Sequence, residues 1–91
     1  MTHAEAIFRA AHAIDRRQGI RVFSRDMIRS QLRIDRAIWK QGYSPIFQGM
    51  RVDEPGGASE APSRFREVFR RISHGKYELT TKGMRLLSDF D

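Results

Sequence analysis

The chain contains no cysteine among its 91 residues. Disulfides, cysteine zinc sites and thiol catalysis are therefore excluded, and we expect a cytoplasmic location. Long apolar runs are also lacking. No stretch approaches the ~20 residues that a membrane span needs, so we expect no membrane partner. The N-terminus leads into an amphipathic pattern instead of the apolar block of a signal peptide.

Acidic residues are few compared with basic ones: 11 Asp and Glu stand against 17 Lys and Arg, a formal net charge of +6. Most of the cations are arginines, whose planar fork suits phosphates and guanine edges. The balance favours a polyanionic partner, with nucleic acid first, an acidic protein surface second and an anionic membrane third. The length indicates a single domain, residues 1–91, with a modest core.

Catalytic constellations are lacking as well. We find no carboxylate pair beside a nucleophile, no phosphate-cradling glycine loop and no metal-ligand spacing. His3 and His12 are isolated, and solvated helix positions explain them. We therefore expect no enzyme, no metal and no cofactor.

Three helices are predicted in the first half of the chain. Apolar residues at helical spacing predict the first over 2–18, with Thr2 as its cap and Gly19 as its stop. Ser24 caps the second, over 25–32, and Ile20–Phe23 before it is a candidate third strand for the hairpin described below. Asp35 caps a short third helix over 36–41 that Gly42 ends, with Trp39 as a core anchor.

Arginines at a four-residue spacing mark the second helix. Arg25, Arg29 and Arg33 form a basic stripe along it, and their like charges repel each other. A phosphate backbone would relieve this repulsion. A solvated helix face is the alternative interpretation.

A further helix is predicted over 44–51, because Ser44 as N-cap followed by Pro45 is a typical helix start. Ile46, Phe47 and Met50 would face inward. Ser44, Gln48 and Arg51 fall on the opposite face, where Gln and Arg side chains can read base edges in a major groove. The alternative is a short exposed helix that packs and reads nothing. An acidic Pro/Gly loop follows over 53–63.

Phe69 to Leu79 reads as two strands joined by a tight turn at His74-Gly75, where Gly75 supplies a positive φ. With Ser73 opposite Lys76, Ile72 would face Tyr77 and Arg71 would face Glu78. The helical spacing of Phe65, Val68, Phe69 and Ile72 competes with the first strand. We resolve it as a helical or irregular lead-in over 63–67 and a strand from about 68; a helix over 63–73 is the alternative. Thr80 or Thr81 caps a last helix, with Met84, Leu87 and Phe90 on the side that closes the core or meets a partner.

Two short motifs carry a family resemblance. Phe69-x-Arg71-Ile72-x-x-Gly75-x-Tyr77-x-Leu79 is similar to the wing of winged helix-turn-helix domains attached to restriction-endonuclease-like proteins. Phe23-Ser24-Arg25-Asp26-Met27-Ile28 is similar to the strand-into-helix opening of the same domains. The resemblance implies an α+β fold, mostly helical with a small antiparallel hairpin wing. Nothing in the chain resembles the nuclease half.

This resemblance implies binding to double-stranded DNA, as the recognition module of a restriction or regulatory system. A homodimer, or a nuclease fused to or associated with the chain, is a further partner consistent with it. A protein-interaction module that docks on an acidic surface is the rival function. Recognition of RNA or of a modified base is a third option, which the sequence does not separate from DNA binding. We expect base contacts from Ser44, Gln48 and Arg51, and backbone contacts from Arg25, Arg29, Arg33, Arg70, His74 and Lys76.

Overall fold

The computed structural model describes residues 1–52 and 61–91. These residues form several helices and a two-stranded antiparallel hairpin, which confirms the α+β class. Most of the predicted acidic loop falls on residues 53–60, outside the described part. In chain order the elements are α1 (His3–Gln18), α2 (Arg25–Leu32), α3 (Arg36–Ile38), the π-helical turn η1 (Trp39–Tyr43), α4 (Ser44–Gly49), the 3₁₀ turn η2 (Ser63–Phe65), β1 (Phe69–Ser73), β2 (Lys76–Leu79) and α5 (Thr81–Leu87).

Side-chain caps start four of these helices. Each capping oxygen accepts a hydrogen bond from a backbone N–H group that has no partner within the helix. The capping residues are Thr2, Ser24, Asp35 and Thr80. Their side-chain oxygens accept from the N–H groups of Glu5 (3.1 Å), Met27 (3.2 Å), Ile38 (2.8 Å) and Gly83 (3.1 Å), respectively. Gly19 ends α1 in the left-handed region, with φ 66°. These boundaries confirm the predicted starts of these four helices and the end of α1.

The helical segment 36–49 is continuous, so two sequence predictions are wrong. Gly42 does not end a helix, because it lies within η1. Ser44 is not an N-cap, because its φ and ψ of −59° and −43° are helical and its N–H donates to the carbonyl of Trp39, five residues back. Pro45 has no N–H to donate to the preceding turn, which is a physical reason for the wider π turn directly before it.

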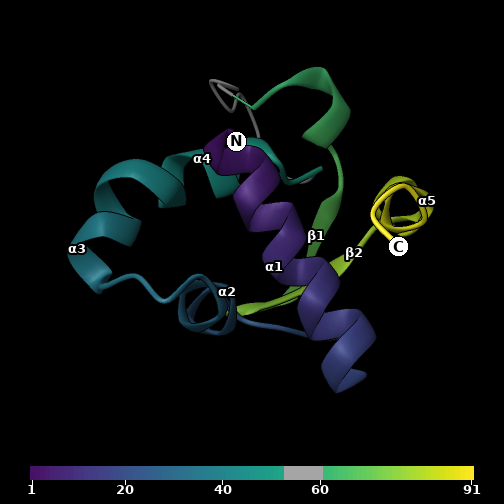
Figure 1. The fold of residues 1–91 in the computed structure, drawn as a ribbon, viewed down its shortest axis with the longest axis horizontal. Coiled ribbons are helices and arrows are strands. Elements are labelled where there is room, and N and C mark those ends of the chain that lie inside the picture. Colours follow the sequence, from purple (N-terminus) through teal and green to yellow (C-terminus); the bar gives the residue numbers. More distant parts are fainter. Residues whose placement is uncertain (53–60) are drawn as a thin grey trace.

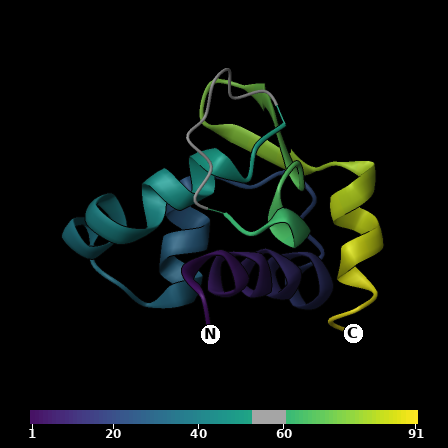
Figure 2. The ribbon, with the colours of Figure 1, turned by 90° about the horizontal axis from the view of Figure 1, so that it is seen from above.

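One hydrophobic core joins these elements. In Figure 1, α1 crosses the molecule in front of the hairpin, with α3 and α5 on opposite sides of it, and Figure 2 shows the same separation from above. Phe47 lies at the centre of an aromatic group, with ring centroids 5.1 Å from Phe69 and 5.0 Å from Tyr77. Phe8 of α1 also packs near Phe69, with ring centroids 6.4 Å apart. Trp39 is buried, as predicted.

The hairpin is confirmed, but its predicted register is wrong beyond the first pair. Ser73 pairs with Lys76, whereas Arg71 pairs with Tyr77 and Arg70 with Glu78, so the ion pair is Arg70–Glu78. Ile72 is the extra residue of a bulge and is 44% exposed. A two-residue type I′ turn requires positive φ at both central residues, and in this turn only Gly75 has it. The bulge on β1 accommodates the different turn.

The remaining predicted elements are confirmed. Phe23 forms an antiparallel bridge to Tyr77, with N–H···O distances of 2.9 and 2.8 Å, so the candidate third strand is a single bridge. Residues 63–67 are a 3₁₀ turn and an irregular lead-in to β1. α5 closes the core: Leu87 is fully buried, and the ring of Phe90 lies 5.2 Å from that of Phe8.

Candidate functional site

Arg25 joins three elements of the fold. Ser24 caps α2 and the Phe23–Tyr77 bridge fixes the preceding chain, so Arg25 begins its helix beside β2. Its Nε donates to the Tyr77 hydroxyl at 3.1 Å, and its NH1 donates to the Ser44 hydroxyl at 3.2 Å. The side chain therefore ties α2 to the hairpin and to α4.

Aromatic rings surround the same guanidinium group. The Cζ of Arg25 lies 5.3 Å from the ring centroid of Phe47 and 5.7 Å from that of Tyr77. The Cζ of Arg51 lies 5.3 Å from the same Tyr77 ring. A guanidinium within about 6 Å of an aromatic face is attracted by the ring quadrupole. Two cations thus share one tyrosine ring.

The predicted base-reading residues belong to this arrangement. Ser44 and Gln48 of α4 are half-buried, and so is Arg51, whose NH1 donates to Gln48 Oε1 at 3.0 Å. The predicted helix over 44–51 ends earlier, at Gly49, so Arg51 lies after it, where it bridges to Phe69 of β1. The sequence placed these three residues and Arg25 in separate groups, whereas the structure brings them together. We define the Tyr77 cluster as Arg25, Ser44, Phe47, Gln48, Arg51 and Tyr77.

The three residues of the predicted Arg25/Arg29/Arg33 stripe have different surroundings. Arg29 donates to Asp26 Oδ1 at 3.3 Å and to the Ile34 carbonyl at 3.1 Å, so its charge is compensated within its own helix. Arg33 lies after the helix as its C-cap, in the left-handed region with φ 58°. Arg25 differs from Arg29, because in the described ranges it contacts no carboxylate.

The hairpin tip carries the remaining predicted contacts. Arg70 forms an ion pair with Glu78, which compensates its charge. His74 Nδ1 lies 3.4 Å from Arg71 NH2, and Lys76 is exposed. Arg71 is the cross-strand partner of Tyr77, so both side chains leave the same face of the ribbon. Arg71 therefore leaves the face of the hairpin that carries Tyr77, whereas Lys76 and Arg70 leave the opposite face.

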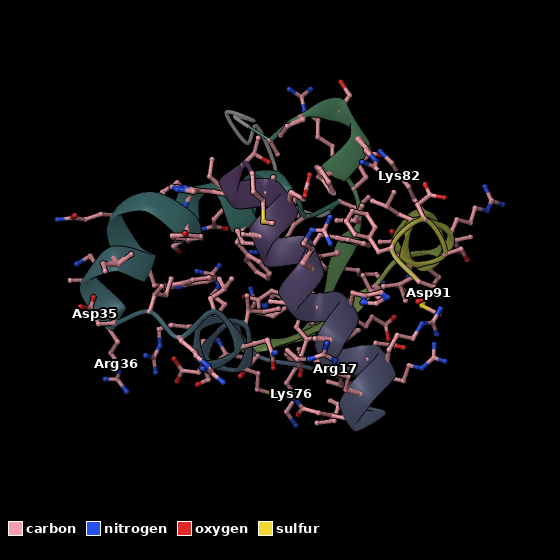
Figure 3. The ribbon with its side chains drawn as sticks, viewed as in Figure 1. Arg17, Asp35, Arg36, Lys76, Lys82 and Asp91 are labelled. Carbon is pink, nitrogen blue, oxygen red and sulfur yellow. The ribbon has the colours of Figure 1, made fainter. Side chains whose placement is uncertain are left out.

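Sequence reasoning missed three relevant residues. Arg36 and Lys40 are exposed on the first half of segment 36–49, and neither contacts a carboxylate in the part of the chain that the structure describes. Their four-residue spacing after the Asp35 cap indicates that both side chains lie on one helix face. The predicted helix end at Gly42 hid this, because it divided segment 36–49 into two separate helices. Figure 3 shows Arg36 and Lys76 on the lower side of the molecule, with Lys82 on the upper right. The Tyr77 hydroxyl gave no sequence signal.

Both helical histidines have partners and are not isolated. His3 Nδ1 lies 2.9 Å from the Gly42 carbonyl, and its ring stacks on Tyr43 at 4.1 Å. His12 Nε2 lies 2.6 Å from Asp91 Oδ1. Asp91 also accepts from Arg16, and these hydrogen bonds, that of Arg16 first, lower the pKa of Asp91. This group of side chains joins α1 to the segment after α5, away from the Tyr77 cluster.

Two other classes of site receive no support from the described residues. Nowhere within 1–52 and 61–91 do three His, Asp or Glu side chains gather as metal ligands would. None of the helices in these ranges has the length and apolar character of a membrane-spanning helix. Comparison of the chain with family models, with curated proteins and with solved structures gave no match, so the winged-helix resemblance stays a prediction.

Proposed function

We propose that the chain is a winged helix-turn-helix domain that binds duplex DNA. The order of elements supports this: α2 and the segment 36–49 are joined by the short turn 33–35, and the hairpin follows as a wing. The observation that carries the proposal is the charge of Arg25. This half-buried cation meets hydroxyls and rings but, among the described residues, no carboxylate. A DNA phosphate would supply the missing negative charge.

Further exposed cations lie after α2, on α3 and η1, and on β2. Arg33, Arg36, Lys40 and Lys76 are exposed, and in ranges 1–52 and 61–91 none forms an ion pair. They would contact further phosphates, while Gln48 and Arg51 remain the candidates for base edges. We do not include Arg29 and Arg70 in the proposed interface, because Asp26 and Glu78 compensate their charges. The resemblance extends this proposal to the recognition module of a restriction or regulatory system.

Duplex binding across a salt series tests the proposal. The probe is a fluorescently labelled duplex of mixed sequence, about two helical turns long. Neutralising about five phosphates predicts that log K falls with log salt at a slope near −4 to −5. Absence of binding at low salt would overturn the proposed function.

A matched pair of arginines tests the location of the interface. Arg36 and Arg85 are both exposed on helices, and neither forms an ion pair within the described residues. Their helices α3 and α5 lie on opposite sides of the molecule (Figures 1 and 2). Arg36→Gln should reduce the magnitude of the salt slope by about 0.9, whereas Arg85→Gln should leave it unchanged. Equal effects would contradict this location.

A second pair tests the division between base and phosphate contacts. Arg51→Ala should reduce the preference for one duplex sequence over another, because a base-reading fork is removed. Lys76→Ala should weaken binding to all sequences alike. The measurement is the ratio of affinities across a panel of duplexes. Identical profiles for the two variants would refute the division.

A further inference from the structure

We propose that Arg25, held by the hydroxyls of Tyr77 and Ser44, forms a seat for one phosphate group of a nucleic-acid backbone. This inference rests on the proposed function and deepens it. It also changes the role of Ser44 from a base contact to a positioning residue. Tyr77 has the same positioning role. From the sequence it was predicted only as a strand residue of the wing.

The hydrogen-bond inventory identifies the kind of ligand. A guanidinium carries five N–H donors and no acceptor. Arg25 uses its Nε on Tyr77 and its NH1 on Ser44, and its NH2 donates to nothing within residues 1–52 and 61–91. Both hydroxyls accept from Arg25, so each keeps a proton to donate. The cluster around Arg25 therefore offers donors in excess of acceptors, which suits an acceptor-only group such as a phosphate.

The geometry also holds the guanidinium in place before a ligand arrives. Two hydroxyls fix two of its nitrogens, and the rings of Phe47 and Tyr77 lie 5.3 and 5.7 Å from its Cζ. A side chain that is already ordered loses less entropy when it binds. Arg29, one helical turn later, is ordered by a carboxylate and a carbonyl instead, and these use the charge that a phosphate would need.

The surroundings favour a phosphate over the carboxylate of a protein partner. Arg71 is exposed and leaves the same ribbon face as Tyr77. The Cζ of Arg51 lies 5.3 Å from the centroid of the same Tyr77 ring. A chain of regularly spaced anions can engage several of these cations at once, as the backbone of a duplex does.

Tyr77→Phe is the most selective variant for this test. It removes the hydroxyl that holds Nε and keeps the buried ring, which packs edge-on against Phe47 at 5.0 Å. Ser44→Ala removes the second hydroxyl from a half-buried position. Both variants retain the charge of Arg25 and remove only a hydroxyl that orients it. They therefore test whether the orientation of the guanidinium contributes to binding in addition to its charge.

The experiment is a double-mutant cycle measured on the labelled duplex across the salt series. The proteins are wild type, Arg25→Gln, Tyr77→Phe and the combined variant, with Arg85→Gln as the control. Arg25→Gln should lower affinity roughly ten- to hundredfold and reduce the slope magnitude by about 0.9. Tyr77→Phe should lower affinity roughly three- to tenfold in wild type but have no further effect beside Arg25→Gln. Circular dichroism and thermal melting establish that each protein is folded.

Three results would overturn the seat. One is an equal change of slope for Arg25→Gln and Arg85→Gln. Another is a Tyr77→Phe effect of the same size with and without Arg25. The third is Arg25-dependent binding of polyglutamate together with duplex binding that Arg25→Gln leaves unchanged, which would assign the site to a protein carboxylate. If Arg25→Gln does not fold, Tyr77→Phe and Ser44→Ala alone decide, since each should lower affinity several-fold in the folded protein. Failure of the proposed function is distinct, because wild type would then bind no duplex.

Discussion

Gly83 of α5 lies against the carbonyl group of Val68 so closely that no side chain fits between them. A Cβ at Gly83 would lie 3.2 Å from the Val68 carbonyl carbon, in contact with its oxygen, and 2.9 Å from Leu79 Cδ2. The same Val68 carbonyl accepts the N–H of Thr80 at 2.9 Å. Thr80 is the N-cap of α5, so this contact positions the start of the helix against the chain that enters β1.

Gly83→Ala should therefore destabilise the protein by about 1–3 kcal/mol, because the added methyl forces the backbone of α5 away from Val68. In an open helix the same substitution stabilises, by about 1 kcal/mol. The two expectations differ in sign, so urea unfolding decides between them. Ser88→Ala, at an exposed position after the same helix, is the control and should stay within about 0.5 kcal/mol of wild type. A more stable Gly83→Ala protein would contradict the close approach.

The bulge at Ile72 predicts an unequal response within β1. Ile72 is 44% exposed and does not pair with Tyr77, so Ile72→Ser should change stability by no more than about 0.5 kcal/mol. Phe69 is fully buried between Phe47 and Phe8, so Phe69→Ala should cost about 3–5 kcal/mol. Unfolding in urea measures both. A large loss of stability for Ile72→Ser would contradict the bulge and support the register expected from the sequence, in which Ile72 faces Tyr77.

Local signals explain what was predictable. Caps at Thr2, Ser24, Asp35 and Thr80 act within three residues, so each is visible in a short window of sequence. The turn at Gly75 is equally local. These signals were sufficient for the order of elements and for most helix starts.

Contacts between distant residues explain what was not predictable. Arg25 meets Ser44, 19 residues away, and Tyr77, 52 residues away, so helical spacing alone could not distinguish it from Arg29. Gly42 resembles a helix stop in the sequence, yet its missing side chain leaves room for His3, whose Cε1 would lie 3.2 Å from an added Cβ. The extra residue in β1 depends on the conformation of His74, which the residue types alone do not determine.

The contact between His3 and the π turn gives a third prediction. His3 hydrogen-bonds the Gly42 carbonyl and stacks on Tyr43, so His3→Ala should lower the free energy of unfolding by about 1–2 kcal/mol. His3→Phe keeps the stacking and loses the hydrogen bond, and should cost about half as much. Trp39 fluorescence follows unfolding, because that ring lies beside Tyr43.

His74→Ala is the matched control for His3, since His74 is an exposed histidine at the hairpin tip. Its substitution should stay within about 0.5 kcal/mol of wild type. If His3→Ala and His74→Ala have the same small effect, the contact with the π turn contributes nothing measurable.

Asp91 should make stability depend on pH in the acid range. Arg16 donates to its carboxylate from Nε and NH2, each at 3.0 Å, and His12 Nε2 lies 2.6 Å away. These bonds, with that of Arg16 the largest cause, hold the pKa of Asp91 below its ordinary value of 3.8. A carboxyl whose pKa is lower in the folded state binds its proton more readily when unfolded. It therefore stabilises the fold above pH 3.8, and this contribution is lost as the pH falls through the folded pKa.

Asp91→Asn should consequently lower the urea midpoint near neutral pH and have a decreasing effect as the solution is acidified below pH 3.8. The measurement is the difference in midpoint between wild type and variant across this range. Asp89→Asn is the charge-matched control, because that carboxylate lies 3.8 Å from Arg64 NH2 with both side chains exposed. Its effect should stay within about 0.5 kcal/mol at neutral pH. A difference between wild type and Asp91→Asn that persists unchanged into acid would mean that the amide loses packing, and that the charge on Asp91 is not the stabilising feature.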